Sequence, residues 1–281
     1  MSDNRKAGRG VKPPAARHYD PYTRDKRPDA GSGDEDAAGT VIEGRNTVIE
    51  AIRAKIAIDK IFVANEESDP TIRYIVSSAR AAGAVVVQTD RRKLDSMSVT
   101  HAHQGVIALA ACTEYVTIGD ILDIARQRNE NPLIIICDEI SDPHNLGAII
   151  RTCEASGAHG VIVPKRRSSG LTATVAKASS GAVYHTAVAR VTNLTAAIEE
   201  IKKAGVWVFG AAERGSTQLW QADFKGPSAI VIGSEGTGIN RLVGEKCDFS
   251  VNIPMFGKLS SLNASVSAAI LLYEAVRQRR A

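Results

Sequence analysis

From Pro132 onward, the chain alternates short apolar runs with segments of helical periodicity. Residues 133–137 form an uninterrupted apolar run of strand length, and a helix-like segment follows at 146–156. A strand that is apolar on both faces is typical of a parallel sheet, because helices cover both faces of such a sheet. The alternation continues with strands at 161–163, 187–191, 206–210 and 230–233 and a helix at 194–205. It predicts a doubly wound, parallel α/β sheet.

Three stretches rich in Gly, Ser and Asn lie where strands of this sheet are predicted to end. They read DEISDPHNLGAIIRTCEASG (138–157), IVIGSEGTGI (230–239) and IPMFGKLSSLNASVSAAILLYEAVRQRR (253–280). In open α/β sheets, ligands bind at the carboxyl ends of the strands. The last stretch reads as a strand end, a polar loop and a long helix that begins with small residues. Free main-chain groups beside a helix N-terminus suit a small polar ligand.

Together these stretches resemble the motifs of the SpoU/TrmH branch of the SPOUT-class RNA methyltransferases. The resemblance lies in N-L-G-A-I-I-R-T, G-S-E-G-T-G and I-P-M-x-G-x-x-S-S-L-N-x-S-V, in that order, and spans residues 132–279. It implies a sheet whose C-terminal end is threaded into a trefoil knot. It also implies a homodimer and the transfer of a methyl group from S-adenosylmethionine to a ribose 2′-OH in RNA.

The resemblance also implies roles for individual residues. Arg151 matches the arginine assigned to 2′-OH activation, and it lies close enough to Asn145 in the sequence for both to reach one pocket. Because a guanidinium group barely deprotonates, we expect Arg151 to orient the hydroxyl and stabilise a forming alkoxide. An arginine packed at an interface is the alternative. The other residues that match the catalytic set are Asn145, Glu235, Ser261 and Asn263.

The main chain of Gly233, Ile253 and Leu262 matches the positions that hold the methyl donor, and Ala211 is added because it follows a predicted strand. For Ser261 and Asn263, a helix cap is the alternative role. We also expect the last helix to offer a dimer interface through its small and apolar residues. These are Ala264, Ala268, Leu271 and Leu272.

The chain before Pro132 divides into a tail (1–39), a small α/β unit (40–112) and a connector (113–131) that precede the predicted knotted domain (132–281). The tail is rich in Pro, Gly, Ala and charge and is expected to be disordered. Its basic first part either touches phosphates or is a solvated tail. In the connector, Thr117 can cap a helix at 118–128 that buries Leu122 and Ile124.

The small unit, with the wording EGRNTVIEAI and HAHQGVIA, resembles the RNA-binding domain that precedes the catalytic domain in several SpoU methyltransferases. That domain is similar to ribosomal proteins that bind kink-turns. The candidates for RNA contact are Arg45, Asn46, His103 and Gln104, for which cap or turn roles are the alternative. In the large domain, the basic run Lys165, Arg166 and Arg167 is a candidate for phosphate contact. A solvated loop is the alternative there.

Composition excludes several other classes of protein. No apolar run approaches the length of a membrane span, and the polar N-terminus lacks the apolar core of a signal peptide. The four cysteines have no metal-ligand spacing, and His101 and His103 mark a polar turn rather than a metal site. These features favour a metal-free, cytoplasmic protein. The formal charge of +4 permits an RNA partner, and no G-x-G-x-x-G follows a predicted strand.

The domain order and the wording of both domains look most like the subgroup that methylates a guanosine of 23S rRNA. The resemblance therefore implies methylation of a ribose 2′-OH in RNA, with a guanosine of the large-subunit (23S) rRNA as the target. Methylation of tRNA is the alternative within the class, although the common tRNA enzymes of this branch lack the small N-terminal domain. The alternative from another class is an RNA-binding or ribosome-assembly protein that has lost catalysis. Arg151, Asn145, Glu235, Ser261 and Asn263 are all present, which argues against that loss.

Overall fold

The computed structural model describes residues 41–65, 69–213 and 215–280. The predicted tail, residues 1–39, lies outside the described residues. None of the helices described is long and apolar enough to cross a membrane.

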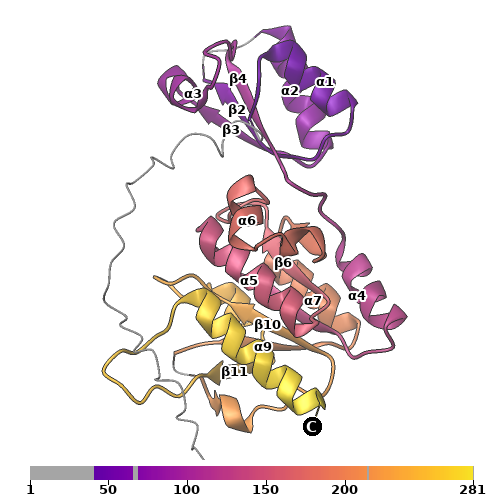
Figure 1. Cartoon of the computed structure of the whole chain (residues 1–281), viewed down its shortest axis with the longest axis vertical. Coiled ribbons are helices and arrows are strands. Elements are labelled where there is room, and N and C mark those ends of the chain that lie inside the picture. Colours follow the sequence, from indigo (N-terminus) through magenta and orange to yellow (C-terminus); the bar gives the residue numbers. More distant parts are fainter. Residues whose placement is uncertain (1–40, 66–68, 214, 281) are drawn as a thin grey trace, which may run out of the picture. The chain divides into compact units, whose positions relative to one another are not determined.

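The first part of the chain forms a four-stranded mixed sheet (Figure 1). The strand order is β1 (Val41–Glu43), β4 (Val106–Ala110), β2 (Ile58–Ala64) and β3 (Val85–Thr89), and only β2 and β3 are parallel. The helices are α1 (Arg45–Arg53), α2 (Pro70–Ala81) and α3 (Arg91–Met97). Helix α2 begins where the Asp69 side chain accepts a hydrogen bond from Thr71 N and Pro70 takes the first helical position.

The second part forms a seven-stranded sheet in which every pairing is parallel. The strand order is β7 (Val188–Val191), β6 (Gly160–Pro164), β5 (Leu133–Cys137), β10 (Ser228–Ile232), β8 (Trp207–Ala211), β11 (Phe249–Asn252) and β9 (Thr217–Gln218). The predicted parallel α/β fold is therefore confirmed. The order places the carboxyl ends of β10, β8 and β11 next to one another.

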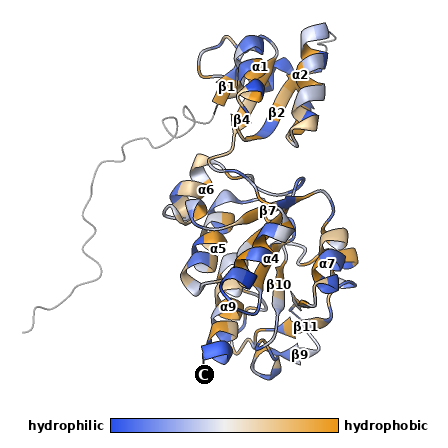
Figure 2. Ribbon diagram, turned by 90° about the vertical axis from the view of Figure 1, so that its right-hand side faces the viewer, coloured by the Kyte–Doolittle hydropathy of each residue, from blue (hydrophilic) through white to orange (hydrophobic). Residues whose placement is uncertain are grey.

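Helices cover both faces of this sheet. The helices on one face are α5 (Pro143–Ser156), α6 (Ala173–Ala178) and α9 (Ala264–Arg280), and those on the other are α4 (Ile118–Gln127), α7 (Leu194–Lys203) and α8 (Arg241–Gly244). Strand β5 explains this layering, because Ile135 packs with the first set while Ile134 and Ile136 pack with the second. Figure 2 shows the strands as hydrophobic and the helices as amphipathic.

Two expectations about buried helix faces were wrong. Helix α4 has the predicted Thr117 cap, but it buries Ile118, Ile121 and Ala125, while Leu122 and Ile124 are only half-buried. On α9, the four residues proposed for a dimer interface are at most 5% exposed and pack into the chain's own core. They recur at the i, i+4, i+7, i+8 spacing of a core-facing stripe, so they pack against the sheet and α5 of their own chain.

Candidate active site

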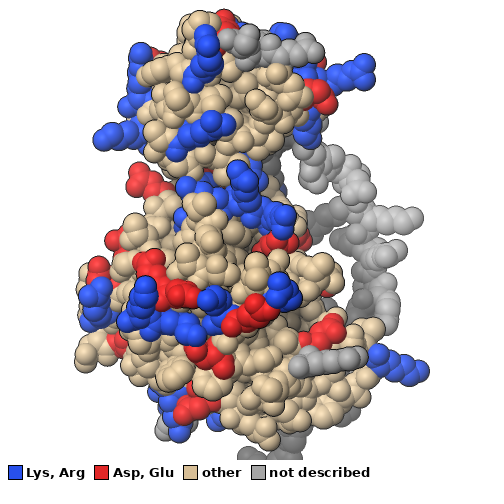
Figure 3. Space-filling view, turned by 180° about the vertical axis from the view of Figure 1, so that it is seen from behind, with Lys and Arg blue, Asp and Glu red and all other residues tan. Residues whose placement is uncertain are grey.

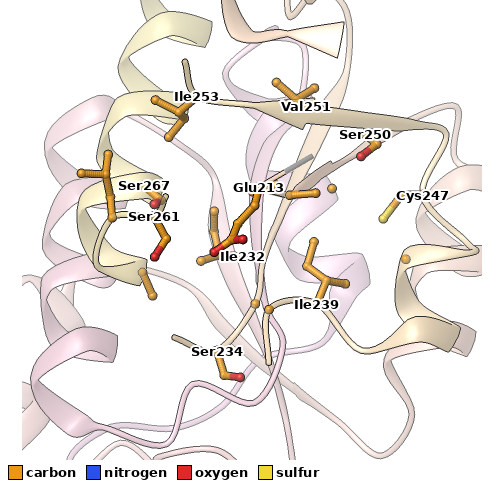
Figure 4. A pocket seen from close by; sticks show the side chains of 18 of the residues that line it. Glu213, Ile232, Ser234, Ile239, Cys247, Ser250, Val251, Ile253, Ser261 and Ser267 are labelled. Carbon is orange, nitrogen blue, oxygen red and sulfur yellow. The ribbon is translucent and has the colours of Figure 1, made fainter. Parts of the chain in front are cut away.

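A cavity of about 660 Å³ lies at the carboxyl ends of β8, β10 and β11. Its walls come from three loops that follow these strands and from the first turn of α9. In Figure 4, Ile253 and Val251 lie along one wall and Ser234 along the opposite one, while Glu213 and Ser261 direct their oxygens inward. The three strand ends identified in the sequence therefore contribute unequally. The stretches 230–239 and 253–280 line this cavity, and the stretch 138–157 lies beside it.

Residues 233–239 form a wall made largely of backbone. Ser234 N donates to Gly238 O at 3.1 Å, and Gly238 N donates to Ser234 O at 2.9 Å, which folds the loop back on itself. A Cβ atom on Gly233 would lie 2.1 Å from Gly238 C, so only glycine allows this close approach. Gly238 has φ +66°, a conformation that also favours glycine. The first and last glycines of G-S-E-G-T-G follow from these two requirements.

The cavity offers both apolar and polar contacts. Ile232, Ile239 and Val251 supply branched apolar side chains, whereas Ser267 and Glu213 supply a hydroxyl and a carboxylate. S-adenosylmethionine has matching parts: a flat adenine, a ribose with hydroxyls and an amino acid with an ammonium group. The volume, the apolar walls and the backbone cradle at Gly233 therefore fit this molecule.

The four positions predicted to hold the methyl donor all lie in the lining of this cavity. They are Ala211, Gly233, Ile253 and Leu262. Reasoning from the sequence missed Glu213, Thr237 and Ser267. Glu213 follows the end of β8 by two residues, so the rule that added Ala211 could have included it.

Three predicted catalytic residues form one hydrogen-bonded cluster that reaches the cavity through Glu235, one of the lining residues. Asn145 Nδ2 donates to Glu235 Oε1 at 3.0 Å, and Asn263 Nδ2 donates to Asn145 Oδ1 at 2.9 Å and also to Glu235 Oε1. The other amide atom, Asn263 Oδ1, accepts from the main-chain nitrogens of Ser265 and Val266 at the start of α9. Asn263 therefore caps the helix and joins the cluster at once, so the cap considered from the sequence is present.

The remaining two catalytic candidates, Ser261 and Arg151, lie in different places relative to the cavity. Ser261 lines the cavity. Arg151 is exposed on α5, lies outside the cavity lining, and makes no hydrogen bond or ion pair with the residues that the structure describes. Six residues along a helix turn the side chain about 120° away from Asn145. Within one chain, Arg151 and Asn145 thus do not reach the same pocket, contrary to the expectation from their spacing.

In the small sheet domain, Arg45 and Gln104 lie together. Arg45 Nε donates to Gln104 O at 3.0 Å, Arg45 N donates to Gln104 Oε1 at 3.3 Å, and the Arg45 guanidinium pairs with Asp69 at 2.8 Å. Asn46 is exposed beside them. His103 is only 4% exposed and uses both ring nitrogens, one for Gly105 N–H and one for Asp95. His103 therefore shapes this loop from inside.

The loop that carries Gln104 is fastened by Glu43, which the sequence did not single out. The Glu43 carboxylate accepts hydrogen bonds from the Ser98 and Thr100 hydroxyls and from the main-chain nitrogens of Val99 and Thr100. Burial opposes its ionisation, but these hydrogen bonds outweigh burial and lower the pKa of Glu43 to about 2. The partners lie more than 50 residues along the chain, so no local pattern could reveal them.

The basic run after β6 is largely exposed. Arg166 and Arg167 are exposed, Lys165 is half-buried, and Arg167 pairs with Glu139 at 2.9 Å. In Figure 3, Lys and Arg project from the small-sheet domain with few acidic side chains among them, whereas both charges are mixed over the larger domain. Within residues 41–65, 69–213 and 215–280, no group of three or more His, Cys, Asp and Glu side chains could hold a metal ion.

The fold and the cavity define a class of protein: an α/β enzyme that holds a small ligand at the ends of parallel strands. Family models narrow this class. Residues 132–273 match the SpoU rRNA Methylase family, and residues 41–116 match the RNA 2′-O ribose methyltransferase substrate-binding domain. The chain belongs to the SpoU rRNA Methylase family, and it is an RNA methyltransferase that uses S-adenosylmethionine.

Known relatives agree with this assignment. The chain is 47% identical to YacO of Bacillus subtilis (strain 168), assigned to the TrmH family of tRNA/rRNA methyltransferases, over 84% of this chain and 94% of that protein. A TrmH family relative from Staphylococcus haemolyticus is 45% identical over 85% of this chain and 96% of its own length.

Solved structures show the same likeness. The SpoU methyltransferase AviRb from Streptomyces viridochromogenes, in complex with the cofactor AdoMet, has a TM-score of 0.53 at 26% identity, over 85% of this chain and 90% of its own. An AdoMet-bound rRNA methyltransferase from Sinorhizobium meliloti has a TM-score of 0.54 at 26% identity, over 85% of this chain and 87% of its own.

Proposed function

We propose that this enzyme methylates the ribose 2′-OH of a guanosine in large-subunit (23S) rRNA. The observation that carries the proposal is the hydrogen-bonded cluster of Asn145, Glu235 and Asn263 beside a cavity that fits S-adenosylmethionine. The substrate-binding domain at residues 41–116 supports a large RNA substrate. We further infer three parts: an RNA-binding domain (40–112), a connector (113–131) and a methyltransferase domain (132–281) with a trefoil knot.

The residues of the cavity have distinct tasks in this reaction. S-adenosylmethionine supplies an electrophilic methyl group, so the protein has to hold the 2′-OH in line with that group and help remove its proton. Ile232, Ile239 and Val251 enclose the flat part of the donor, and the main chain of Gly233 and Leu262 meets its polar groups. The Ser261 hydroxyl contacts the ribose or its phosphate.

Arg151 completes the site from a second copy of the chain. It is exposed outside its own cavity, on the same helix layer as α9. Helix α9 exposes Val266 at 45% and Tyr273 at 51% of their surfaces. Large apolar side chains exposed together mark a protein interface. We propose that a homodimer covers them and brings Arg151 of one subunit to the cavity of the other, beside the phosphate of the target nucleotide.

In the RNA-binding domain, Arg45, Asn46 and Gln104 form the proposed contact surface, with Lys165, Arg166 and Arg167 as phosphate contacts on the methyltransferase domain. His103 is not part of this proposal, because its ring is buried and both nitrogens are bonded.

The activity is tested with purified protein, tritiated S-adenosylmethionine, and rRNA and tRNA from a strain that lacks the enzyme. We expect label at one position of the large-subunit rRNA that blocks alkaline cleavage there, and none with Arg151→Ala. Label in tRNA would overturn the rRNA substrate but keep the enzyme. Binding of the donor without label in either RNA would point to an assembling ribosomal particle as the substrate, and no binding of the donor would contradict the proposed reaction.

The shared site is tested with two inactive variants, Arg151→Ala and Ser261→Ala. Each homodimer should be inactive, whereas co-expressed mixed dimers should regain activity, because one of their two sites then has both side chains intact. Mixed dimers that form and stay inactive would contradict an arginine contributed by the partner.

A further inference from the structure

A second cavity, of about 400 Å³, lies beside the methyl-donor cavity. It opens at the carboxyl ends of β5 and β6 and at the starts of α7 and α8. Residues 233–239 line the donor cavity, and the next residues, Asn240, Leu242 and Val243, line the second one. One short segment therefore forms part of the wall of both cavities.

The most unusual group in this second cavity is the Asp138 carboxyl. Asp138 is only 3% exposed, and one oxygen, Oδ2, accepts a hydrogen bond from Asn240 N at 2.6 Å. The other oxygen, Oδ1, accepts no hydrogen bond from the residues that the structure describes. It is also not among the fully enclosed side-chain atoms without a partner, so it keeps some exposed surface, and Asp138 lines the cavity. A buried carboxyl oxygen with no partner favours a ligand that can donate a hydrogen bond.

The neighbouring Glu139 adds a second acceptor. Its φ of +58° is rare for a residue with a side chain, and such strained positions cluster at functional sites. One Glu139 oxygen pairs with Arg167 at 2.9 Å, and Glu139 is among the residues that line the cavity. Burial raises the pKa of Asp138, with Glu139 adding to this and the Asn240 hydrogen bond opposing it. The two side chains present acceptors next to each other.

The other residues that line this cavity differ in chemistry from Asp138 and Glu139. Leu242 is 54% exposed and gives a flat apolar surface. Asn193 lines the cavity and uses its Oδ1 to cap α7, which leaves its Nδ2 available as a donor. Arg166 is exposed and lines the same cavity. The site therefore pairs acceptors inside with donors outside and has an apolar edge.

We propose that this second cavity binds a guanine base of the RNA substrate. Guanine carries two adjacent donors, N1–H and the 2-amino group, that match the acceptors of Asp138 and Glu139. Its O6 acceptor suits the Asn193 amide or Arg166, and its ring lies against Leu242. Proteins that read single-stranded RNA recognise bases in this way, through hydrogen bonds to the Watson–Crick edge. This inference rests on the proposed RNA substrate and names a base that the enzyme reads.

The test measures nucleotide binding by calorimetry with S-adenosylhomocysteine held in the donor cavity. The probes are guanosine, inosine and adenosine 5′-monophosphates, which share one phosphate and differ in the base. We expect guanosine monophosphate to bind best. Inosine monophosphate lacks the 2-amino group and should bind several-fold more weakly, and adenosine monophosphate lacks both donors and should bind weakest. Equal binding of all three, or no binding of guanosine monophosphate at roughly 10 mM, would overturn the inference.

Asp138→Asn is the matching variant. Its amide oxygen can still accept from Asn240 N, so the loop is retained, but an N–H group then faces the base. We expect at least about a tenfold loss of guanosine monophosphate affinity, with S-adenosylhomocysteine affinity unchanged. Glu200→Gln, on the exposed side of α7, removes the same charge outside the cavity and should change neither affinity. An unchanged guanosine monophosphate affinity in Asp138→Asn would also overturn the inference.

The outcome is separable from that of the proposed function. Methyl transfer to RNA without any selectivity for guanosine monophosphate would leave the enzyme assignment and remove the second cavity from it. Selective binding of guanosine monophosphate without methyl transfer would support the second cavity as a guanine site and contradict the proposed reaction.

Discussion

Single polar side chains at this site act on more than one element. Asn263 caps α9 with its oxygen and holds Asn145 and Glu235 with its nitrogen. The same amide therefore fixes the helix that lines the donor cavity and the carboxylate at its edge. A substitution can separate the two tasks, because only the oxygen serves the cap.

We expect Asn263→Ala to lower the free energy of unfolding by about 1 kcal/mol through loss of the cap and to reduce methyl transfer strongly. Asn263→Asp keeps an oxygen for the cap but faces the Glu235 carboxylate, so it should retain most stability and still lose transfer. Urea unfolding and the tritium assay measure the two effects. An Asp variant that is fully active would show that the donated hydrogen bonds are dispensable.

A buried histidine makes stability depend on pH. His159 Nδ1 accepts from Leu133 N at 2.9 Å, and Nε2 lies 3.0 Å from Glu130. Burial lowers the pKa of His159 from its usual 6.5, although Glu130 opposes this. The unfolded chain therefore takes up a proton before the folded one. His159 thus stabilises the fold above the usual pKa, and this contribution falls as pH decreases below it.

We expect the free energy of unfolding of the wild type to fall as the pH decreases from 7 to 5. This fall should be steeper than in His159→Gln by up to about 1 kcal/mol per pH unit. Urea titrations at each pH measure this. Identical pH slopes for the two proteins would mean that His159 titrates alike in the folded and unfolded chain.

At the scale of elements, the loop between β10 and α8 depends on glycine at some positions and not at others. Gly233 and Gly236 both line the donor cavity. A Cβ atom on Gly233 would meet the backbone of Gly238 at 2.1 Å, whereas one on Gly236 would meet nothing within 4 Å. These two positions form a matched pair for testing whether the folded shape of the loop matters.

We expect Gly233→Ala to weaken S-adenosylmethionine binding by at least about tenfold, because backbone cannot yield as a flexible side chain does. Gly236→Ala should bind the donor nearly as well as the wild type. Calorimetry with S-adenosylmethionine measures both. Equal affinities in the two variants would place the donor away from this loop.

At the scale of the whole molecule, the outer face of α9 is available to a second copy. We expect Tyr273→Lys to shift the protein from dimer to monomer and to abolish methyl transfer, with little loss of stability, because Tyr273 is half exposed. Tyr74→Lys, at an exposed tyrosine of α2, is the control and should remain dimeric. Sedimentation velocity reads the oligomeric state. A dimeric Tyr273→Lys would move the interface elsewhere.

The sequence by itself determined the parallel sheet and the positions that line the donor cavity. The sheet follows from local patterns, apolar runs such as 133–137, whereas the positions predicted to hold the donor follow from the resemblance of the strand-end motifs to a known family. Gly233, Ile253 and Leu262 could be placed because their motifs resemble those of a known family, and Ala211 could be placed because it follows a predicted parallel strand, whose carboxyl end lies at the ligand-binding edge of the sheet.

Only the tertiary structure decided which way individual side chains point. The turn of helix α5 separates Arg151 from Asn145, and the sheet buries the α9 residues proposed as an interface. His103 is buried with both ring nitrogens bonded, to Asp95 and to Gly105 N. Asp138 and Asn240 lie 102 residues apart, and Asn145 and Asn263 lie 118 apart. Such contacts depend on how the strands cross over, and local periodicity carries no information about that arrangement.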